Sequence, residues 1–217
     1  MTARGLRRDG IGTRFEVIYD GTSAGEAVIA VPGEHNVRNA LAAVAVGLAL
    51  GFTVPQMAPG LARFGGVERR FQLLGEHHDI MVVDDYAHHP TEVRATIQAA
   101  RAAAPERRLV VAFQPHLFSR TRDFAGEFAS ALSAADEVLL CDVYPSREQP
   151  MPGVTSALVA DGLRASGRAP CWEGPQARLA EALLGVTRAG DLVITMGAGD
   201  VTRSGHEFVA RLGAARP

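Results

Sequence analysis

The 217-residue sequence contains no lysine, because all 22 of its basic residues are arginine. A Schiff base, a Ser/Lys dyad and a Walker A phosphate loop each require a lysine amine, so this chain can provide none of them. Cysteine is also scarce: Cys141 and Cys171 are the only two, and each lies in an apolar stretch typical of a buried strand. We therefore expect two buried free thiols in a reducing cytoplasm, and no disulfide.

The sequence also lacks an excess of charge of either sign. Its formal net charge is −2 and its pI is about 6.4, so no basic field exists to hold a nucleic acid or an anionic membrane. No apolar run reaches the ~20 residues that cross a bilayer, because glycines interrupt the richest stretch, residues 40–52. The Arg-rich N-terminus has no apolar segment behind it and does not resemble a signal peptide. This composition is typical of a soluble cytoplasmic protein with neither a nucleic-acid nor a membrane partner.

Residues 1–76 contain few predicted elements. Apolar and polar residues alternate around a turn within residues 15–31, which predicts a β-hairpin. Helical spacing follows over residues 35–50 and 54–64. Two strands and two helices in about 70 residues are close to the lower limit for independent stability. We therefore expect this part to be the remnant of a larger domain.

Residues 77–217 alternate short β-rich runs with longer helical ones. Continuous apolar strands separated by helices indicate a parallel sheet that is covered on both faces. This part therefore predicts a complete α/β domain with a doubly wound, mostly parallel, Rossmann-like sheet. The predicted strands are residues 80–83, 109–113, 138–141, a short one near Cys171 and 192–195, and the predicted helices are residues 91–104, 123–132, 155–165, 176–187 and one ending near Leu212.

The chemically unusual residues follow the predicted strands. Because the carboxyl ends of parallel strands share one edge of a sheet, these residues predict a ligand crevice at that edge. The four segments are residues 84–90 (Asp-Asp-Tyr-Ala-His-His-Pro), 114–120 (Gln-Pro-His-Leu-Phe-Ser-Arg), 142–148 (Asp-Val-Tyr-Pro-Ser-Arg-Glu) and 197–200 (Gly-Ala-Gly-Asp).

Some of these segments also have a purely structural interpretation. The His-His-Pro run at residues 88–90 could cap a helix, and its adjacent histidines point apart, which disfavours zinc. We therefore predict no metal ligands. Residues 197–199 lack the third glycine of a dinucleotide fingerprint, so we expect their backbone amides to face the crevice at a helix N-terminus. No strained serine elbow is present for Ser/His/Asp chemistry.

Residues in and next to the first part add polar groups of their own. Asn36 and Asn39 lie three residues apart at the start of a predicted helix and share one face of its first turn. Such amides can cap a helix or read the edge of a nucleobase through paired donors and acceptors. Arg69 and Arg70 lie near the junction of the two parts, where a guanidinium suits phosphate oxygens or a salt bridge between domains.

Together these segments resemble the Mur ligases, and among them the members that add L-alanine to UDP-N-acetylmuramate. The resemblance extends from about Phe15 to Leu212. The string at residues 84–92 favours the alanine-adding members over those that add later amino acids. The motifs that carry the resemblance are residues 33–40 (Gly-Glu-His-Asn-Val-Arg-Asn-Ala), 69–71 (Arg-Arg-Phe), 84–92 (Asp-Asp-Tyr-Ala-His-His-Pro-Thr-Glu), 113–116 (Phe-Gln-Pro-His) and 142–145 (Asp-Val-Tyr-Pro).

The resemblance implies a three-domain enzyme with a UDP-sugar domain, a central ATPase domain and a C-terminal Rossmann-like domain that brings in the amino acid. Residues 1–76 would be the end of the ATPase domain, and residues 77–217 would be the amino-acid-binding domain. The phosphate loop and the main magnesium ligands would lie before Met1. We therefore expect this fragment to be inactive without the missing domains and to bind neither ATP nor Mg²⁺ tightly.

In the implied reaction, ATP phosphorylates the lactyl carboxylate of UDP-N-acetylmuramate, and the amine of L-alanine attacks the acyl phosphate. Positioning by arginines and magnesium would matter more than covalent participation by the protein. The implied site residues are Asn36 and Asn39 at the adenine of ATP with His35 beside them, Arg70 at the phosphate and Asp85 near the ribose as the catalytic pair, and Tyr86, His88, His116 and Arg120 in the alanine pocket.

This sequence departs from the family pattern at Leu117, where an arginine is frequent, and at residues 146–147, where small residues are common. We expect Asp84 to be turned away from the crevice and to tolerate replacement better than Asp85. Two other functions remain open: a non-catalytic Rossmann-like binding module, and a fragment of the related ligase that recycles murein tripeptide.

Overall fold

The computed structural model describes residues 1–214, which form two compact units. The first unit comprises Met1–Val67 with Gln98–Pro105, and the second comprises Glu68–Ile97 with the residues from Glu106 on. Each unit has its own sheet and its own hydrophobic core.

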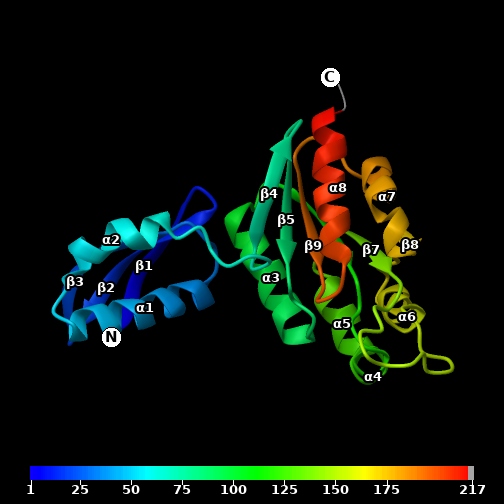
Figure 1. Cartoon of the computed structure of the whole chain (residues 1–217), viewed down its shortest axis with the longest axis horizontal. Coiled ribbons are helices and arrows are strands. Elements are labelled where there is room, and N and C mark those ends of the chain that lie inside the picture. The colour runs from blue at the N-terminus through cyan, green and yellow to red at the C-terminus, as the bar shows by residue number, and fades with distance from the viewer. Residues whose placement is uncertain (215–217) are drawn as a thin grey trace. The chain divides into compact units, whose positions relative to one another are not determined.

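The first unit is a three-stranded antiparallel sheet with two helices, α1 (Glu34–Ala49) and α2 (Val54–Arg63) (Figure 1). Strands β2 (Gly12–Tyr19) and β3 (Thr22–Ile29) form the predicted hairpin. Both helices begin and end within one residue of their predicted bounds. Their apolar faces and the sheet bury one core, which includes Phe15, Val17, Ile29, Val37, Val44 and Val54.

Strand β1 (Thr2–Asp9) extends the first sheet and was not predicted from the sequence. None of its residues is buried, so its side chains show no alternation of apolar and polar character. Backbone pairing with β2 holds this strand in the sheet, from Thr2 opposite Ile18 to Asp9 opposite Gly12. Pairing of this kind leaves no hydrophobic pattern in the sequence.

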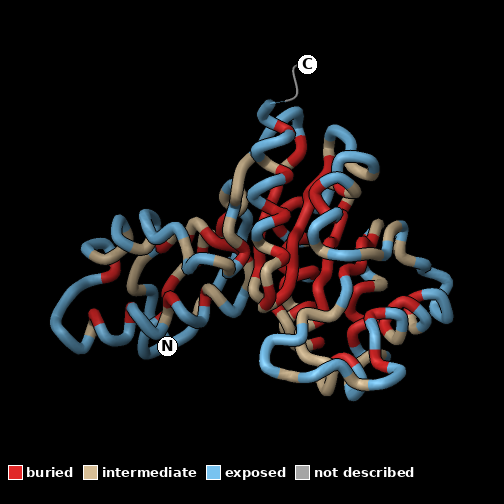
Figure 2. The backbone as a smooth tube through the Cα atoms, turned by 45° about the vertical axis from the view of Figure 1, so that its right-hand side comes forward, coloured by how far each residue is buried: buried red, intermediate tan, exposed pale blue. Residues whose placement is uncertain are grey.

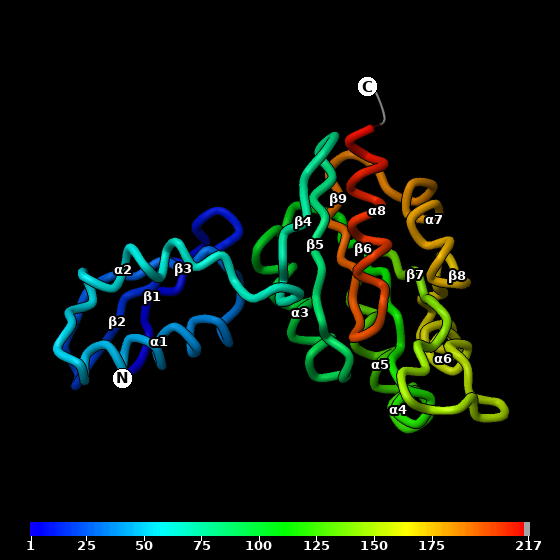
Figure 3. Tube along the Cα trace, in the orientation of Figure 1, coloured from blue at the N-terminus to red at the C-terminus, as the bar shows by residue number. Residues whose placement is uncertain are grey.

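The second unit contains a six-stranded sheet in the order β4-β5-β9-β6-β7-β8, which can be followed in Figure 3. Every pairing from β5 to β8 is parallel, which confirms the predicted doubly wound, mostly parallel sheet. Strand β9 is buried along its whole length between β5 and β6. The parallel strands are β5 (Ile80–Asp85), β6 (Arg108–Phe113), β7 (Glu137–Cys141), β8 (Trp172–Gly174) and β9 (Asp191–Met196).

The sixth strand, β4 (Gln72–His77), pairs antiparallel with β5 and was also not predicted. The expected boundary between residues 76 and 77 falls inside this strand, whereas the two units divide between Val67 and Glu68. A strand belongs to the sheet that supplies its hydrogen bonds, so the residues of β4 lie with the second unit.

Helices cover both faces of the second sheet (Figure 1). Helices α7 (Leu179–Val186) and α8 (Val201–Ala214) pack on one face, where they form a core with Val82, Val110 and Val193. The opposite face carries α3 (Pro90–Ala103) and α5 (Ala125–Leu132), while α6 (Ala157–Ala165) contacts α5. Figure 2 shows buried residues along the strands between these layers. Within residues 1–214, no helix has both the length and the apolar character to cross a membrane.

Two predicted helices begin differently in the structure. The helix expected over residues 123–132 is α5, and a short helix that was not predicted, α4 (Phe118–Asp123), precedes it, separated from it by Phe124, which leaves helical geometry at φ −122°. The ring of Phe124 packs edge-on against His89, with centroids 5.1 Å apart. The helix expected over residues 176–187 begins as the 3₁₀ turn η1 (Gln176–Arg178) and continues as α7.

Both cysteines are free thiols, but only Cys141 is buried. Cys171 is exposed because it immediately precedes β8, the short strand at the edge of the sheet. The expectation that both lie in buried strands is therefore wrong for Cys171. Burial raises the pKa of the Cys141 thiol to about 12, so this thiol is unreactive in the folded protein.

Candidate functional site

The carboxyl ends of β5, β9, β6 and β7 meet at one edge of the second sheet, as predicted. The amide of Gly197, after β9, donates to the carbonyl oxygen of Asp85 at 3.1 Å. The amide of Gln114, after β6, donates to the carbonyl oxygen of Met196 at 2.9 Å. His116 and Tyr144, after β6 and β7, form an isolated parallel bridge. The loops that follow these four strands are therefore hydrogen-bonded neighbours.

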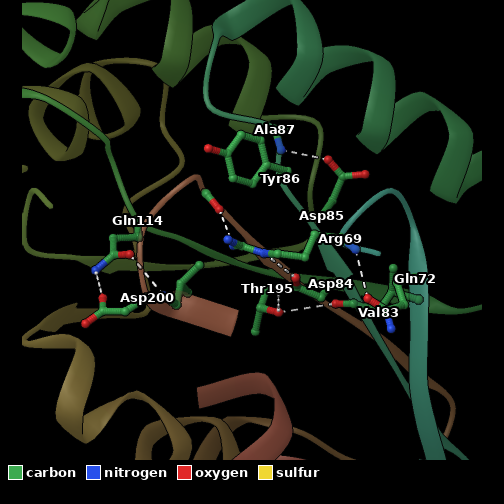
Figure 4. Close-up of polar contacts among 12 residues, drawn as sticks. Arg69, Gln72, Val83, Asp84, Asp85, Tyr86, Ala87, Gln114, Thr195 and Asp200 are labelled. Carbon is green, nitrogen blue, oxygen red and sulfur yellow. Dashed lines mark hydrogen bonds and ion pairs between the residues drawn. The ribbon is translucent and has the colours of Figure 1, made fainter. Parts of the chain in front are cut away.

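Arg69 connects the ends of β5 and β9 (Figure 4). Its Nε lies 3.0 Å from Asp84 Oδ2, and its Nη2 donates to the carbonyl oxygen of Gly197 at 2.6 Å. The guanidinium carbon of Arg69 lies 4.9 Å from the centre of the Tyr86 ring, a cation–π distance. The sequence singled out Arg70 for the cationic role and missed this contribution of Arg69, because nothing in an Arg-Arg pair indicates which side chain turns toward the sheet.

Asp84 is fully buried and is paired on both sides. It forms the ion pair with Arg69 and accepts a hydrogen bond from Thr195 Oγ1 at 2.6 Å. Asp84 does lie on the opposite side of β5 from Asp85, but that side is protein interior. Since removal of one partner leaves a buried group unpaired, we expect replacement of Asp84 to destabilise the fold.

Asp85 holds the backbone directly after Arg70 and directly after Tyr86. Its Oδ2 accepts the amide of Phe71 and its Oδ1 accepts the amide of Ala87, each at 2.8 Å. Burial raises the pKa of this carboxyl, although the two amides oppose the shift. The carboxylate thereby fixes the turn that carries Arg70.

The turn that carries Arg70 is strained. Arg69 and Phe71 have φ values of 59° and 48°, in the left-handed region that non-glycine residues rarely adopt. Arg70, between them, is exposed, and its guanidinium carbon lies 5.9 Å from the centre of the Tyr86 ring. This geometry leaves the Arg70 side chain exposed near the carboxyl end of β5 while its neighbours are held.

His88 and Glu92 are paired at the start of α3. His88 Nδ1 lies 3.0 Å from the carbonyl oxygen of Tyr86 and 3.3 Å from Glu92 Oε2. The same Oε2 accepts the amides of His88 and His89 at 3.0 and 3.2 Å, which caps the helix. Burial alone would raise the pKa of Glu92, but these amides and the charge of His88 lower it. Residues 88–90 therefore do have the helix-capping role left open by the sequence.

His116 lies among rings and an arginine from three loops. Its ring stacks on Tyr144, with centroids 5.8 Å apart and an interplanar angle of 14°, and meets His88 edge-on at 5.8 Å. Arg120 Nη1 lies 3.4 Å from His116 Nδ1 and 3.4 Å from the carbonyl oxygen of His88. Burial, followed by the charge of Arg120, lowers the pKa of His116. The structure therefore brings together the four residues expected in one pocket, Tyr86, His88, His116 and Arg120.

Gln114 fastens the loop after β9, a role that the sequence did not indicate. The buried side chain donates from Nε2 to Asp200 Oδ1 at 2.9 Å and accepts the Val201 amide at 3.1 Å. Since the amide of Gly197 has a protein partner, the expectation that the backbone amides of residues 197–199 face the crevice is wrong for Gly197. A side chain at Gly199 would approach Tyr144 Cγ to 2.6 Å, so this position requires glycine.

Glu148 connects the loop after β7 to α4. It accepts hydrogen bonds from the amide of Ser119 at 2.9 Å and from the hydroxyl of Ser119 at 2.5 Å, and these bonds lower its pKa.

Leu117, where the family often has arginine, has a φ of 71° and donates its amide to the carbonyl oxygen of Tyr144 at 2.9 Å. The backbone at Leu117 therefore supports this edge of the crevice.

The predicted adenine-binding residues lie in the first turn of α1 in the first unit. His35 and Asn39 are exposed, and Asn36 is half-buried. The Nδ2 of Asn36 donates to the carbonyl oxygen of Pro32 at 2.7 Å, which leaves its Oδ1 as the acceptor. The structure thus places these residues together on one turn, but one amide donor is already engaged.

Within the part of the chain that the structure describes, no group of three His, Cys, Asp or Glu side chains is arranged to hold a metal ion. The carboxylates at the crevice are instead paired with protein groups, Asp84 with Arg69 and Glu92 with His88.

The sheet order and the convergence of side chains at its carboxyl edge define a Rossmann-like ligand-binding domain. Residues 69–199 match the family described as "Mur ligase, glutamate ligase domain". The chain belongs to the Mur ligase family.

The chain is similar to Mur ligases over its whole length. The UDP-N-acetylmuramate–L-alanine ligase of Geobacter sulfurreducens is 46% identical over 217 residues, which are 100% of this chain and 47% of that protein. The crystal structure of the UDP-N-acetylmuramate-alanine ligase of Thermotoga maritima is 30% identical, with a TM-score of 0.85 over 99% of this chain and 46% of that one. A MurF ligase from the same organism, solved with ADP, is 18% identical and shares the fold, with a TM-score of 0.72 over 98% of this chain and 46% of that one. This chain therefore spans less than half the length of these proteins.

Proposed function

We propose that this chain is the C-terminal part of a cytoplasmic, ATP-dependent ligase that joins L-alanine to UDP-N-acetylmuramate during peptidoglycan precursor synthesis. The observation that carries the proposal is the 46% identity, over the full chain, to a ligase of that name. The second unit would supply the amino acid, and the first unit would be the end of the ATP-binding domain.

The crevice of the second unit has the chemistry to hold an amino acid. Arg120 offers a guanidinium to the carboxylate of L-alanine, next to the rings of Tyr86, His88 and His116. The exposed Arg70 would contact the phosphate of ATP or the acyl phosphate, where negative charge grows in the transition state. Asp85 would act by holding the turn on which Arg70 lies.

The first unit would contact the adenine of ATP through Asn39 and the free acceptor of Asn36, with His35 beside them. The described residues do not fit a magnesium site of their own, so in this proposal Mg²⁺ would be bound by the missing domains. In this proposal the phosphate loop would also belong to those domains, which is consistent with the lack of lysine in this chain.

The proposal is tested by joining this chain to the N-terminal half of the Geobacter sulfurreducens ligase. We expect ADP release and an amide product that depend on both UDP-N-acetylmuramate and L-alanine, whereas the chain alone should give neither. In the joined enzyme, Arg70→Ala should lower turnover more than it raises the Michaelis constant for ATP, by roughly 2 to 4 kcal/mol.

Two results would contradict this function. A joined enzyme that uses murein tripeptide and not L-alanine would favour the recycling ligase. A chain that binds L-alanine but restores no ligation, although the joined protein is folded, would favour a binding module.

A further inference from the structure

The imidazole of His88 is oriented by two oxygen atoms that can only accept hydrogen bonds. Its Nδ1 lies 3.0 Å from the carbonyl oxygen of Tyr86 and 3.3 Å from the carboxylate oxygen Oε2 of Glu92. The proton of the neutral ring must therefore be on Nδ1, which leaves a lone pair on Nε2. With 23% of the side chain exposed, the ring is not sealed inside the protein.

His116 has the opposite arrangement. Arg120 approaches its Nδ1 at 3.4 Å, and a guanidinium has no lone pair to offer, so Nδ1 accepts and the neutral ring carries its proton on Nε2. Burial and the neighbouring Arg120 lower the pKa of His116, which favours this neutral form. The two rings, 5.8 Å apart, therefore offer one proton donor and one proton acceptor at their Nε2 atoms.

We propose that His88 Nε2 is the proton acceptor for the incoming amine, with Glu92 as its positioning residue. This assignment rests on the proposed ligase function. An amino acid arrives with a protonated amine, which has no electron pair for attack. His88 takes one proton from this ammonium group, and the adjacent Glu92 carboxylate stabilises the imidazolium that forms.

The remaining steps balance atoms and charge without another reactant. The neutral amine forms a C–N bond with the carbonyl carbon of the acyl phosphate. The C–O bond to phosphate breaks, its electron pair leaves with the phosphate, and the phosphate takes the second amine proton. His88 then returns its proton to water, which restores the neutral ring.

Three other candidate bases at this edge of the sheet are already engaged. The Nδ1 lone pair of His116 faces Arg120. Both oxygens of Asp85 accept backbone amides. Glu92 Oε2 faces three N–H groups, and its lowered pKa makes it a weaker base.

The charges around His88 explain why a carboxylate is needed beside it. Arg120 lies on one side, with Nη1 3.4 Å from the His88 carbonyl oxygen, and His116 faces the ring edge-on. Tyr86 meets the ring at 5.2 Å, and the positive charge of Arg70 reaches Glu92. The Glu92 carboxylate contacts the ring. Its negative charge offsets the positive charges of Arg120 and Arg70 when His88 becomes charged.

The arrangement of protons is tested on this chain as it stands. Long-range ¹H–¹⁵N NMR of ¹⁵N-histidine protein at a pH where the rings are neutral should show a protonated Nδ1 and an unprotonated Nε2 for His88. His116 should show the reverse, and His88→Gln and His116→Gln assign the signals. A His88 ring that carries its proton on Nε2 overturns the proposal.

The chemical role is tested in the joined enzyme with two amine acceptors. His88→Gln should lower turnover with L-alanine by roughly 10²- to 10⁴-fold, and a higher pH should restore part of this rate, because more of the amine is then unprotonated. Hydroxylamine is largely unprotonated near neutral pH and needs no base, so its rate should change by less than about tenfold. Glu92→Gln should show the same selective loss to a smaller extent, and Arg94→Ala, exposed on the same helix, should change neither rate.

Equal losses with both acceptors would show that His88 only shapes the pocket, and would overturn the proposal. Failure of the proposed function has a different signature, because the unmutated joined enzyme would then make no amide from L-alanine. In that case the role of His88 in catalysis fails with the function, and the NMR measurement still tests the arrangement of protons on the two rings, since it needs no turnover.

Discussion

Arg69 contributes to this fold through one buried ion pair and one carbonyl contact. Asp84 has no exposed surface, and Arg69 is its cationic partner. Arg69→Ala leaves that carboxylate buried and uncompensated, so we expect a loss of about 3 to 5 kcal/mol in the free energy of unfolding. Urea denaturation followed by circular dichroism measures this change.

A matched control is available on α8. Arg211 pairs with Glu207 one helical turn away, and both side chains are nearly half exposed. Arg211→Ala should change stability by no more than about 0.5 kcal/mol. Equal effects of the two substitutions would mean that burial of Asp84 does not determine the cost.

Asp85 gives the protein a defined response to pH. Burial raises its pKa in the folded state above that of the unfolded chain, so the folded protein binds the proton more tightly. As the pH falls through the folded pKa toward the unfolded one, the wild-type protein should therefore gain stability relative to Asp85→Asn. Unfolding free energies of both proteins at pH 7 and near pH 4 measure the difference, and a relative loss at acid pH contradicts the expectation.

At the scale of single elements, the loop after β9 is shaped by a glycine. A methyl group on Gly199 would lie 2.6 Å from Tyr144 Cγ and would also meet Gln114 Oε1. Gly199→Ala should therefore displace the Gln114 side chain from its hydrogen bonds with Asp200 and Val201. We expect the substitution to destabilise the protein by about 1 to 3 kcal/mol. Gly185→Ala, in α7 with open space around it, should instead be neutral or stabilising by up to about 1 kcal/mol. Thermal unfolding of both variants distinguishes the two outcomes.

The elements that the sequence predicted and the ones that it missed differ in one respect. Strands such as β6 and β9 are buried on both faces and read as continuous apolar runs. Strands β1 and β4 contain no buried residue, so neither leaves such a run. Amphipathic patterns record burial, whereas an edge strand is held by backbone hydrogen bonds that any sequence can supply.

At the scale of the whole molecule, the second unit has the larger share of internal packing. Its sheet is covered on both faces, so we expect a fragment that lacks residues 1–67 to fold by itself and to unfold cooperatively. Cys141 should stay unreactive to a thiol reagent in this fragment until denaturant is added, because it is buried. Reaction of Cys141 in the absence of denaturant would contradict independent folding.

Residues 1–67 are expected to be less well protected from hydrogen exchange than the second sheet. Val46 and Leu50 at the end of α1 are 62% and 71% exposed, so this unit leaves apolar surface in water. We expect hydrogen exchange to be faster in residues 1–67 than along β5, β6 and β9. Equal protection in both units would contradict this expectation.

The sequence by itself determined the parallel α/β sheet, the edge where the functional side chains gather, and the resemblance to the Mur ligases. These features depend on local periodicity, on the residues that follow each strand, and on short motifs such as residues 84–92. The tertiary structure alone decided that Arg69 turns to the sheet and that Asp84 needs a cation. It also decided which atoms face Nδ1 of each histidine, two oxygens at His88 and the Arg120 guanidinium at His116. The physical reason is that β9 inserts between β5 and β6, which brings Thr195 and Gly197 to Arg69 and Asp84, more than 100 residues away along the chain.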